Sequence, residues 1–186
     1  MPAVCVADGL VVDGTGALNV NLDDLHRATI TRAVDQNIAA SAGGCSVLET
    51  KVLWDQTFGT DVGGLADVGN SRIVIARDGL YHLHSAIADG GAANQTPIDG
   101  NPQPRYEVGI VMKRNGSNVA HQRVVRLSPQ GIRLQADRVL ECSAGDTIET
   151  FFEIHRDNGP TAPHLLIFGG STVLQATQLP LQQVLP

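Results

Sequence analysis

A two-residue alternation of apolar and polar residues in the C-terminal two thirds of the chain is its most constraining feature. Tyr81, Leu83 and Ile87 fall on one side of a two-residue period, and residues 106–112 and 148–154 repeat the pattern. Because side chains of a β-strand point alternately to the two faces of a sheet, this period predicts half-buried strands and not helices.

Turn-forming residues separate these alternating segments at short intervals. Asn115-Gly116 is the strongest hairpin signal in the chain, since both residues tolerate the positive φ of a two-residue turn. Polar stretches rich in Gly and Pro, at 89–105 and 157–163, mark longer loops. About eight strands at such spacing predict an all-β sandwich or barrel over residues 51–186.

The composition fits a globular β-protein and argues against two kinds of partner. Of the 186 residues, 42% are hydrophobic, which is enough for a core. The net charge of −6 argues against a general nucleic-acid binder, because neutralising phosphates needs a basic surface. No run approaches the ~18 apolar residues of a transmembrane helix and no secretory signal is evident, so we expect neither membrane insertion nor export.

The first 50 residues differ from the rest and predict a separate N-terminal attachment segment. Residues 9–20 enclose a Gly-rich turn and predict a short hairpin. Asn21 then precedes a broken apolar stripe at near-helical spacing, which predicts a short helix over residues 22–38, although the β-branched residues at 29–31 disfavour it. A segment this short buries little apolar surface alone, so we expect it to dock on its own domain or on a larger assembly.

Four motifs follow one another in the alternating region. They are a strand, turn, Gly and Tyr at 73–81, a long strand ending in Asn-Gly at 106–116, a segment leading to Gly-Asp at 140–148, and a closing Phe-Gly-Gly-Ser at 168–171. In this order and spacing they resemble the C1q/TNF-like superfamily over roughly residues 55–180. The resemblance implies the family's jelly-roll sandwich and its compact homotrimers, with strand faces packed around a threefold axis. The chain departs from the secreted animal members in lacking a collagen-like stalk and a signal peptide, so complement and cytokine functions are not implied.

Some predicted strands are apolar on both faces, which an isolated sandwich does not need. Val111 lies opposite Val108 and Ile110 in its strand, and Phe151 lies opposite Ile148 in another. Buried second faces indicate subunit contacts, unless loops of the same subunit cover them. The candidate trimer-interface residues are Tyr106, Val111, Phe151, Phe152 and Ile154.

The opening of the chain carries a second resemblance. Residues 9–20 resemble the openings of many bacteriophage virion proteins, particularly tail, fibre and head-decoration components. This resemblance implies a non-enzymatic structural virion protein, in which residues 1–50 attach a trimeric head to other virion proteins of the capsid or tail. Its exposed loops, at 89–105 and 157–164, would contact a host-surface glycan or protein. The alternative is a free-standing soluble carbohydrate- or ligand-binding module with a calcium-assisted loop site.

Metal-ligating residues are present but form no recognised motif. His82 and His84 share one strand face and are a candidate metal pair, although spacing supplies no third ligand. Asp89, Asp99 and Asp157 lie in Gly- or Asn-containing loops and are candidate calcium ligands, but none belongs to an EF-hand pattern. The simpler alternatives are surface or interface histidines and turn-forming aspartates. We therefore expect no cofactor, and calcium is the one candidate.

Residues that would indicate catalysis form no recognised pattern. Cys5, Cys45 and Cys142 are too widely spaced for a C-x-x-C metal pair or a disulfide framework, so we expect buried, reduced thiols. No nucleophile elbow, phosphate-binding loop or dinucleotide fingerprint occurs in the sequence. We therefore expect a protein that is not an enzyme and has no catalytic residues.

Overall fold

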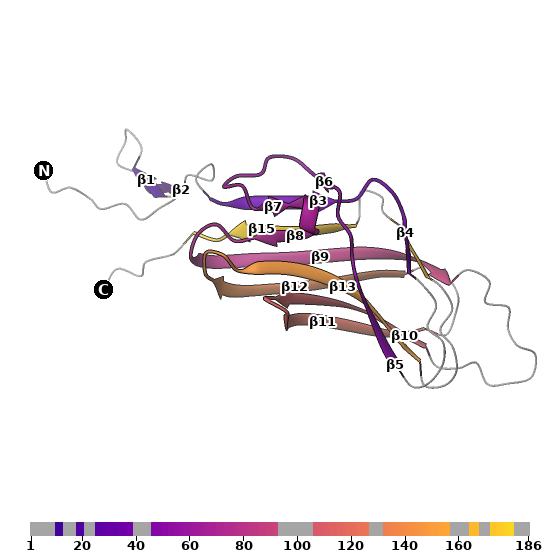
Figure 1. The fold of residues 1–186 in the computed structure, drawn as a ribbon. Coiled ribbons are helices and arrows are strands. Elements are labelled where there is room, and N and C mark those ends of the chain that lie inside the picture. Colours follow the sequence, from indigo (N-terminus) through magenta and orange to yellow (C-terminus); the bar gives the residue numbers. More distant parts are fainter. Residues whose placement is uncertain are drawn as a thin grey trace, which may run out of the picture.

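Two antiparallel β-sheets packed face to face form the body of the molecule (Figure 1). The structure is a computed structural model that describes residues 10–12, 18–20, 25–38, 46–92, 106–126, 132–156, 164–167 and 172–180. A separate hairpin pairs β1 (Leu10–Val12) with β2 (Leu18–Val20), which confirms the hairpin predicted for residues 9–20. Within the described residues, no helix has the length and hydropathy needed to cross a bilayer.

The first sheet has six strands in the order β11-β10-β13-β8-β7, and β5 pairs with β13 beyond the point where β8 ends. Every pairing in this sheet is antiparallel. Its strands are β5 (Ser46–Lys51), β7 (Ala66–Asp67), β8 (Arg72–Val74), β10 (Tyr106–Arg114), β11 (Ser117–Arg126) and β13 (Thr147–Arg156). A single 3-10 turn in the described residues, η2 (Val68–Asn70), connects β7 to β8.

The second sheet has seven strands and is organised around β9, the longest of the described strands. One edge of β9 pairs with β12, and the other pairs first with β15 and then with β14. The outer strands β3, β6 and β4 extend this arrangement. The strands are β3 (Arg27–Thr31), β4 (Gln36–Ile38), β6 (Gln56–Thr57), β9 (Gly79–Ala92), β12 (Ile132–Cys142), β14 (His164–Ile167) and β15 (Val173–Gln178).

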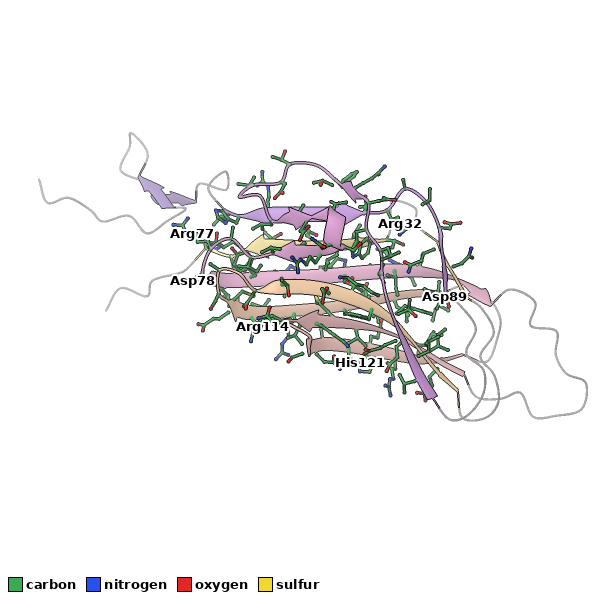
Figure 2. All side chains as sticks on the ribbon, in the orientation of Figure 1. Arg32, Arg77, Asp78, Asp89, Arg114 and His121 are labelled. Carbon is green, nitrogen blue, oxygen red and sulfur yellow. The ribbon has the colours of Figure 1, made fainter. Side chains whose placement is uncertain are left out.

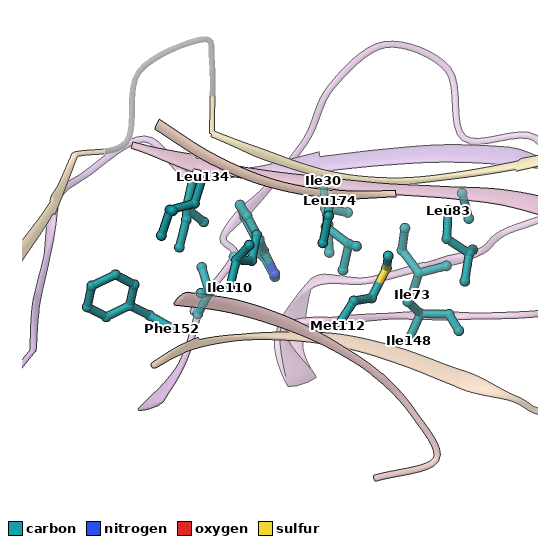
Figure 3. Close-up of a cluster of buried hydrophobic side chains, with 14 of the residues drawn as sticks. Ile30, Ile73, Leu83, Ile110, Met112, Leu134, Ile148, Phe152 and Leu174 are labelled. Atoms are coloured by element: carbon teal, nitrogen blue, oxygen red, sulfur yellow. The ribbon is translucent and has the colours of Figure 1, made fainter. Parts of the chain in front are cut away.

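The inward faces of the two sheets enclose one apolar core (Figure 3). Ile110, Met112 and Phe152 enter it from the six-stranded sheet, and Leu83 and Leu134 from the seven-stranded sheet, all fully buried. Buried and half-exposed residues alternate along β3 and β15. The predicted two-residue period and the predicted sandwich are therefore confirmed.

The helix predicted over residues 22–38 is wrong. This segment forms β3 and β4, which pair with β15 and β14. The β-branched run Thr29-Ile30-Thr31 suits a pleated surface, and Ile30 is fully buried in the core. Each of the two short strands has buried residues at every second position. The turn between them shifts this pattern, so that the apolar residues of the whole segment fall at near-helical spacing.

The domain boundary predicted at residue 50 falls inside β5, which pairs with β13 through six residues. Since β3 and β4 also belong to the sandwich, the first 50 residues are not a separate segment. The side chain of Leu25 is already buried. An attachment role is thus left to the residues before Leu25, where it stays a prediction.

The Asn115-Gly116 turn joins β10 to β11 as predicted, with φ values of +49° and +79°. The Asn115 side chain also reaches the turn before β13: its Nδ2 donates to Asp146 Oδ1 at 2.6 Å, and its Oδ1 accepts from the Thr147 backbone at 2.8 Å. A backbone hydrogen bond from Ser143, helped by the one from Asn115, holds the pKa of Asp146 below its usual value. Two turns far apart in sequence are therefore tied together at one end of the sandwich.

A pair of hydroxyls links the two sheets inside the core. Ser85 in β9 and Thr150 in β13 are both fully buried, and their oxygens lie 2.9 Å apart. Ser85 Oγ also donates to the Val173 carbonyl at 3.2 Å. Since Ser85 has a single hydroxyl proton, Thr150 is the donor in the bond between the sheets.

We expect Ser85→Ala to lower the free energy of unfolding by about 1–3 kcal/mol, because the Thr150 hydroxyl then lacks this acceptor in a dry core. The double variant Ser85→Ala/Thr150→Val should recover part of the loss, since it also removes the orphaned hydroxyl. Urea unfolding of the two single variants and the double variant measures the coupling. Strictly additive losses would contradict a bond between the sheets.

Candidate functional site

Charged side chains that pair with one another cover the outer face of the six-stranded sheet. Lys51 of β5 pairs with Glu149 of β13, and Lys113 of β10 pairs with Glu49 of β5. Lys113 Nζ also lies 4.3 Å from the centroid of the Phe151 ring, a cation–π contact. These charged groups are paired with one another within the chain, so no second protein is required to neutralise them.

A denser charge cluster on the same face surrounds Glu153, which is only 4% exposed. Arg123 donates from Nη2 to Oε1 at 2.6 Å and from Nε to Oε2 at 2.8 Å, and His121 Nε2 lies 2.8 Å from Oε2. Figure 2 shows His121 on the outer strand of this sheet. Burial alone would raise the pKa of the Glu153 carboxyl, but the hydrogen bonds from Arg123 and His121 outweigh it and leave that pKa below its usual value.

Gly109 makes room for this cluster. It stands in β10 between Arg123 of β11 and Glu153 of β13. A Cβ here would lie 3.0 Å from the backbone oxygen of Gln122, 3.1 Å from Glu153 Oε2 and 3.2 Å from Arg123 Cγ. Because Gly109 has no side chain, Arg123 and Glu153 can form their ion pair directly across β10.

The predicted interface residues divide into three groups. Phe152 and Ile154 face the core and are fully buried, so placing them in a trimer interface is wrong: they pack within one subunit. Val111 does belong to the opposite face, but its own chain already covers it, and Phe151 is half-buried beneath a lysine. Tyr106 pairs through its backbone in β10, and its side chain lies outside the described residues.

The outer face of the seven-stranded sheet has a different character, and we call it the neutral face. In the part of the chain that the structure describes, its central strands β9 and β15 place no Asp, Glu, Lys or Arg there. Charged residues stand only on flanking strands, at Arg27 of β3 and at positions in β12. The central outward residues are Leu80, His82, His84, Ala86, Ala88, Val173, Gln175 and Thr177.

The two predicted histidines lie within the neutral face and share one partner, Asp137 of β12. Asp137 Oδ1 is 2.6 Å from His84 Nδ1 and 3.5 Å from His82 Nε2. Sequence reasoning found the histidines but missed Asp137, because β10 and β11 intervene between β9 and β12 in the chain. Only the register that pairs His84 with Asp137 brings them together.

Metal binding stays a prediction. Among the described residues, no group of three His, Cys, Asp or Glu is arranged to hold an ion. Asp89 is buried on the core side of β9, at the far end of the strand from the turn that contains Asp78 (Figure 2), so the structure does not bring it to the histidines. Asp99 and Asp157 lie outside the described residues.

Cys142, at the end of β12, is buried in the core as expected. Burial, reinforced by the negative charge of Asp146, raises the pKa of its thiol. The thiol is therefore protonated at neutral pH and unsuited to nucleophilic attack. The predictions for Cys5 and Cys45 fall outside the described residues.

We expect Gly109→Ala to destabilise the domain by about 1–3 kcal/mol, because the methyl group meets a backbone oxygen and separates Arg123 from Glu153. Gly69→Ala is the matched control, since nothing lies within 4 Å of a Cβ there and its φ is not positive. Thermal unfolding of the two variants tests this. Equal melting temperatures would show that the glycine is not needed for the cluster.

Glu153→Gln removes the charge that Arg123 and His121 bind, and it should cost about 1–2 kcal/mol at pH 7, since Arg123 is partly exposed. The folded-state pKa of Glu153 is lowered, so its contribution is present above the unfolded-state value of about 4.3 and is lost as the pH falls through the folded-state value. The difference in unfolding free energy between wild type and variant should thus shrink below pH ~4. A difference that is constant from pH 7 to pH 3 would refute the charge effect.

Similarity to known proteins is found in the fold and not in the sequence. No protein-family model matches the chain, and no curated protein does. The structure of Eiger TNF from S. frugiperda matches with a TM-score of 0.52 at 12% identity, over 84% of this chain and 93% of that chain. Murine APRIL, in a crystal structure at pH 5.0, matches with a TM-score of 0.51 at 14% identity, over 83% of this chain and 99% of that one. The chain therefore has the all-β, TNF-like jelly-roll fold that its motifs implied.

Proposed function

We propose that this protein is a non-enzymatic assembly module, a homotrimer whose subunits meet through the neutral face. The contrast between the two outer faces carries the proposal. Charges on the six-stranded sheet are paired within the chain, whereas the centre of the neutral face can be desolvated without burying an unpaired charge. Depletion of charge is typical of the centre of subunit interfaces. The proposed number of subunits, three, rests on the resemblance to the C1q/TNF-like superfamily.

The state of three buried nucleophilic groups in the described residues supports a non-enzymatic role. The Cys142 thiol is buried with a raised pKa. The hydroxyls of Ser85 and Thr150 bond to each other inside the core, where no substrate reaches them. These groups stabilise the sandwich and are poorly placed for chemistry.

The proposed setting is a bacteriophage particle. The residues before Leu25 would attach the trimer to other virion proteins, and exposed loops would contact a host-surface glycan or protein. This part rests on the resemblance of residues 9–20 to the openings of virion proteins. The genes that flank this one provide the test: capsid or tail genes would support the setting, and a metabolic operon would contradict it.

One observation favours a ligand-binding role, which is part of the alternative function. An open groove lined by two arginines lies between β11 and β12. Such a groove could bind a ligand in a virion protein as well as in a free-standing module. It therefore supports ligand binding and does not distinguish between the two.

A lysine placed in the neutral face should disrupt the trimer. Gln175 lies opposite His84 in the sheet, and three copies of Gln175→Lys would bring like charges together in the interface. We expect sedimentation velocity to show a trimer for wild type and a monomer with an unchanged fold for this variant. Val47→Lys is the control, because it adds the same charge at an exposed site on the other sheet. A monomeric wild type, or dissociation caused only by Val47→Lys, would refute assembly through the neutral face.

A further inference from the structure

The groove lies between the outermost strands of the two sheets. β11 pairs with β10, β12 pairs with β9, and neither has a second partner among the described strands. The backbone N–H of Gln135 donates to Gln122 Oε1 at 2.8 Å and bridges the two strands. Nearer the Asn115-Gly116 turn they enclose an open space of about 380 Å³. Its lining residues are Arg114, Asn118, Val119, Arg138, Leu140 and Glu141.

Arg138 occupies an unusual position for a charged residue. Along β12 it falls in the series that faces the core, after the buried Leu134 and Ala136 and before the half-buried Leu140. Its side chain is nonetheless exposed and lines the groove. Among the described residues no carboxylate forms an ion pair with it. The groove thus contains a guanidinium that pairs with no carboxylate in the described part of the chain.

Arg114, at the end of β10, supplies a second guanidinium that is held in place. Its Nη1 donates to the Glu141 carbonyl at 2.7 Å and lies 3.8 Å from Asp146 Oδ2. Figure 2 shows it towards the same end of the sandwich as the turn that contains Asp78. A guanidinium has five N–H donors, so these contacts leave others for a ligand. The guanidinium of Arg114, which its own contacts hold in place, and the exposed guanidinium of Arg138 can together bind a planar carboxylate.

The remaining lining residues narrow the class of ligand. Val119 and Leu140 pack against the core and give the groove an apolar wall. The amide of Asn118 both donates and accepts, so it can bind a hydroxyl. Glu141 points to the opposite face of β12 from Leu140, and its backbone carbonyl accepts from Arg114. A single carboxylate, several hydroxyls and an apolar face occur together in sugar acids.

We propose that this groove binds an acidic monosaccharide unit, with its carboxylate on Arg138 and Arg114 and its hydroxyls on Asn118. The inference gives the ligand-binding alternative a site and a ligand class. It does not require the neutral face to mediate assembly, because the groove is formed by one subunit. Failure of either proposal would leave the other standing.

The test uses the full chain and three probes that share a six-membered ring. Methyl β-glucuronide has the carboxylate and the hydroxyls, methyl β-glucoside lacks the carboxylate, and cyclohexanecarboxylate lacks the hydroxyls. Amide chemical shifts followed by NMR report binding at Val119 and Leu140. We expect the glucuronide to bind with a dissociation constant on the order of 1 mM, and each of the other probes to bind about tenfold more weakly.

Matched arginine variants locate the binding site. Arg138→Gln should raise the dissociation constant for the glucuronide about tenfold, whereas Arg133→Gln, on the outer face of the same strand, should leave it unchanged. Unchanged far-UV circular dichroism verifies the fold of both. Equal losses in the two variants, no binding at ~50 mM, or equal affinity for glucuronide and glucoside would overturn the site. Equal affinity for cyclohexanecarboxylate would overturn the sugar assignment.

Discussion

The pairing of β9 along both of its edges is the constraint on which the rest of the structure depends. Its 14 residues join β12 on one side, and β15 followed by β14 on the other. A strand held in this way cannot slip by one residue, since a slip would exchange the core face with the outer face along its whole length. Leu83 and Ile87 are thereby committed to the core, and His82 and His84 to the neutral face.

The two sheets solve the same problem, an outer face next to water, in different ways. In the six-stranded sheet, lysines and arginines neutralise glutamates on other strands of the same sheet. In the seven-stranded sheet, the described parts of the central strands place no full charge on the outer face and present Thr, Gln, His and apolar side chains there. Charged side chains are therefore distributed unevenly between the two outer faces in the described residues, and whole-chain composition conceals the difference. Only the second solution leaves a broad area that can be dehydrated at low cost.

Local patterns predicted the features that depend on neighbouring residues. The alternation along β10 and β13 and the Asn115-Gly116 turn are properties of a few consecutive residues, and they were found correctly. The structure of segment 22–38 was predicted wrongly, because its strands form by pairing with β14 and β15 near the other end of the chain. Asp137 and the groove escaped notice for the same reason: their neighbours are set by strand register, which a single sequence does not reveal.

The ion pair that closes over Gly109 has a consequence for how such sequences diverge. Three positions on three adjacent strands form one unit, so a side chain at position 109 is less destabilising once Arg123 or Glu153 has been replaced by a smaller residue. Substitutions at these sites should accumulate in a preferred order, with the charged partners lost first. In an alignment of relatives, the three columns would then covary, and a glycine in the middle of a long strand would mark lineages that retain the buried pair.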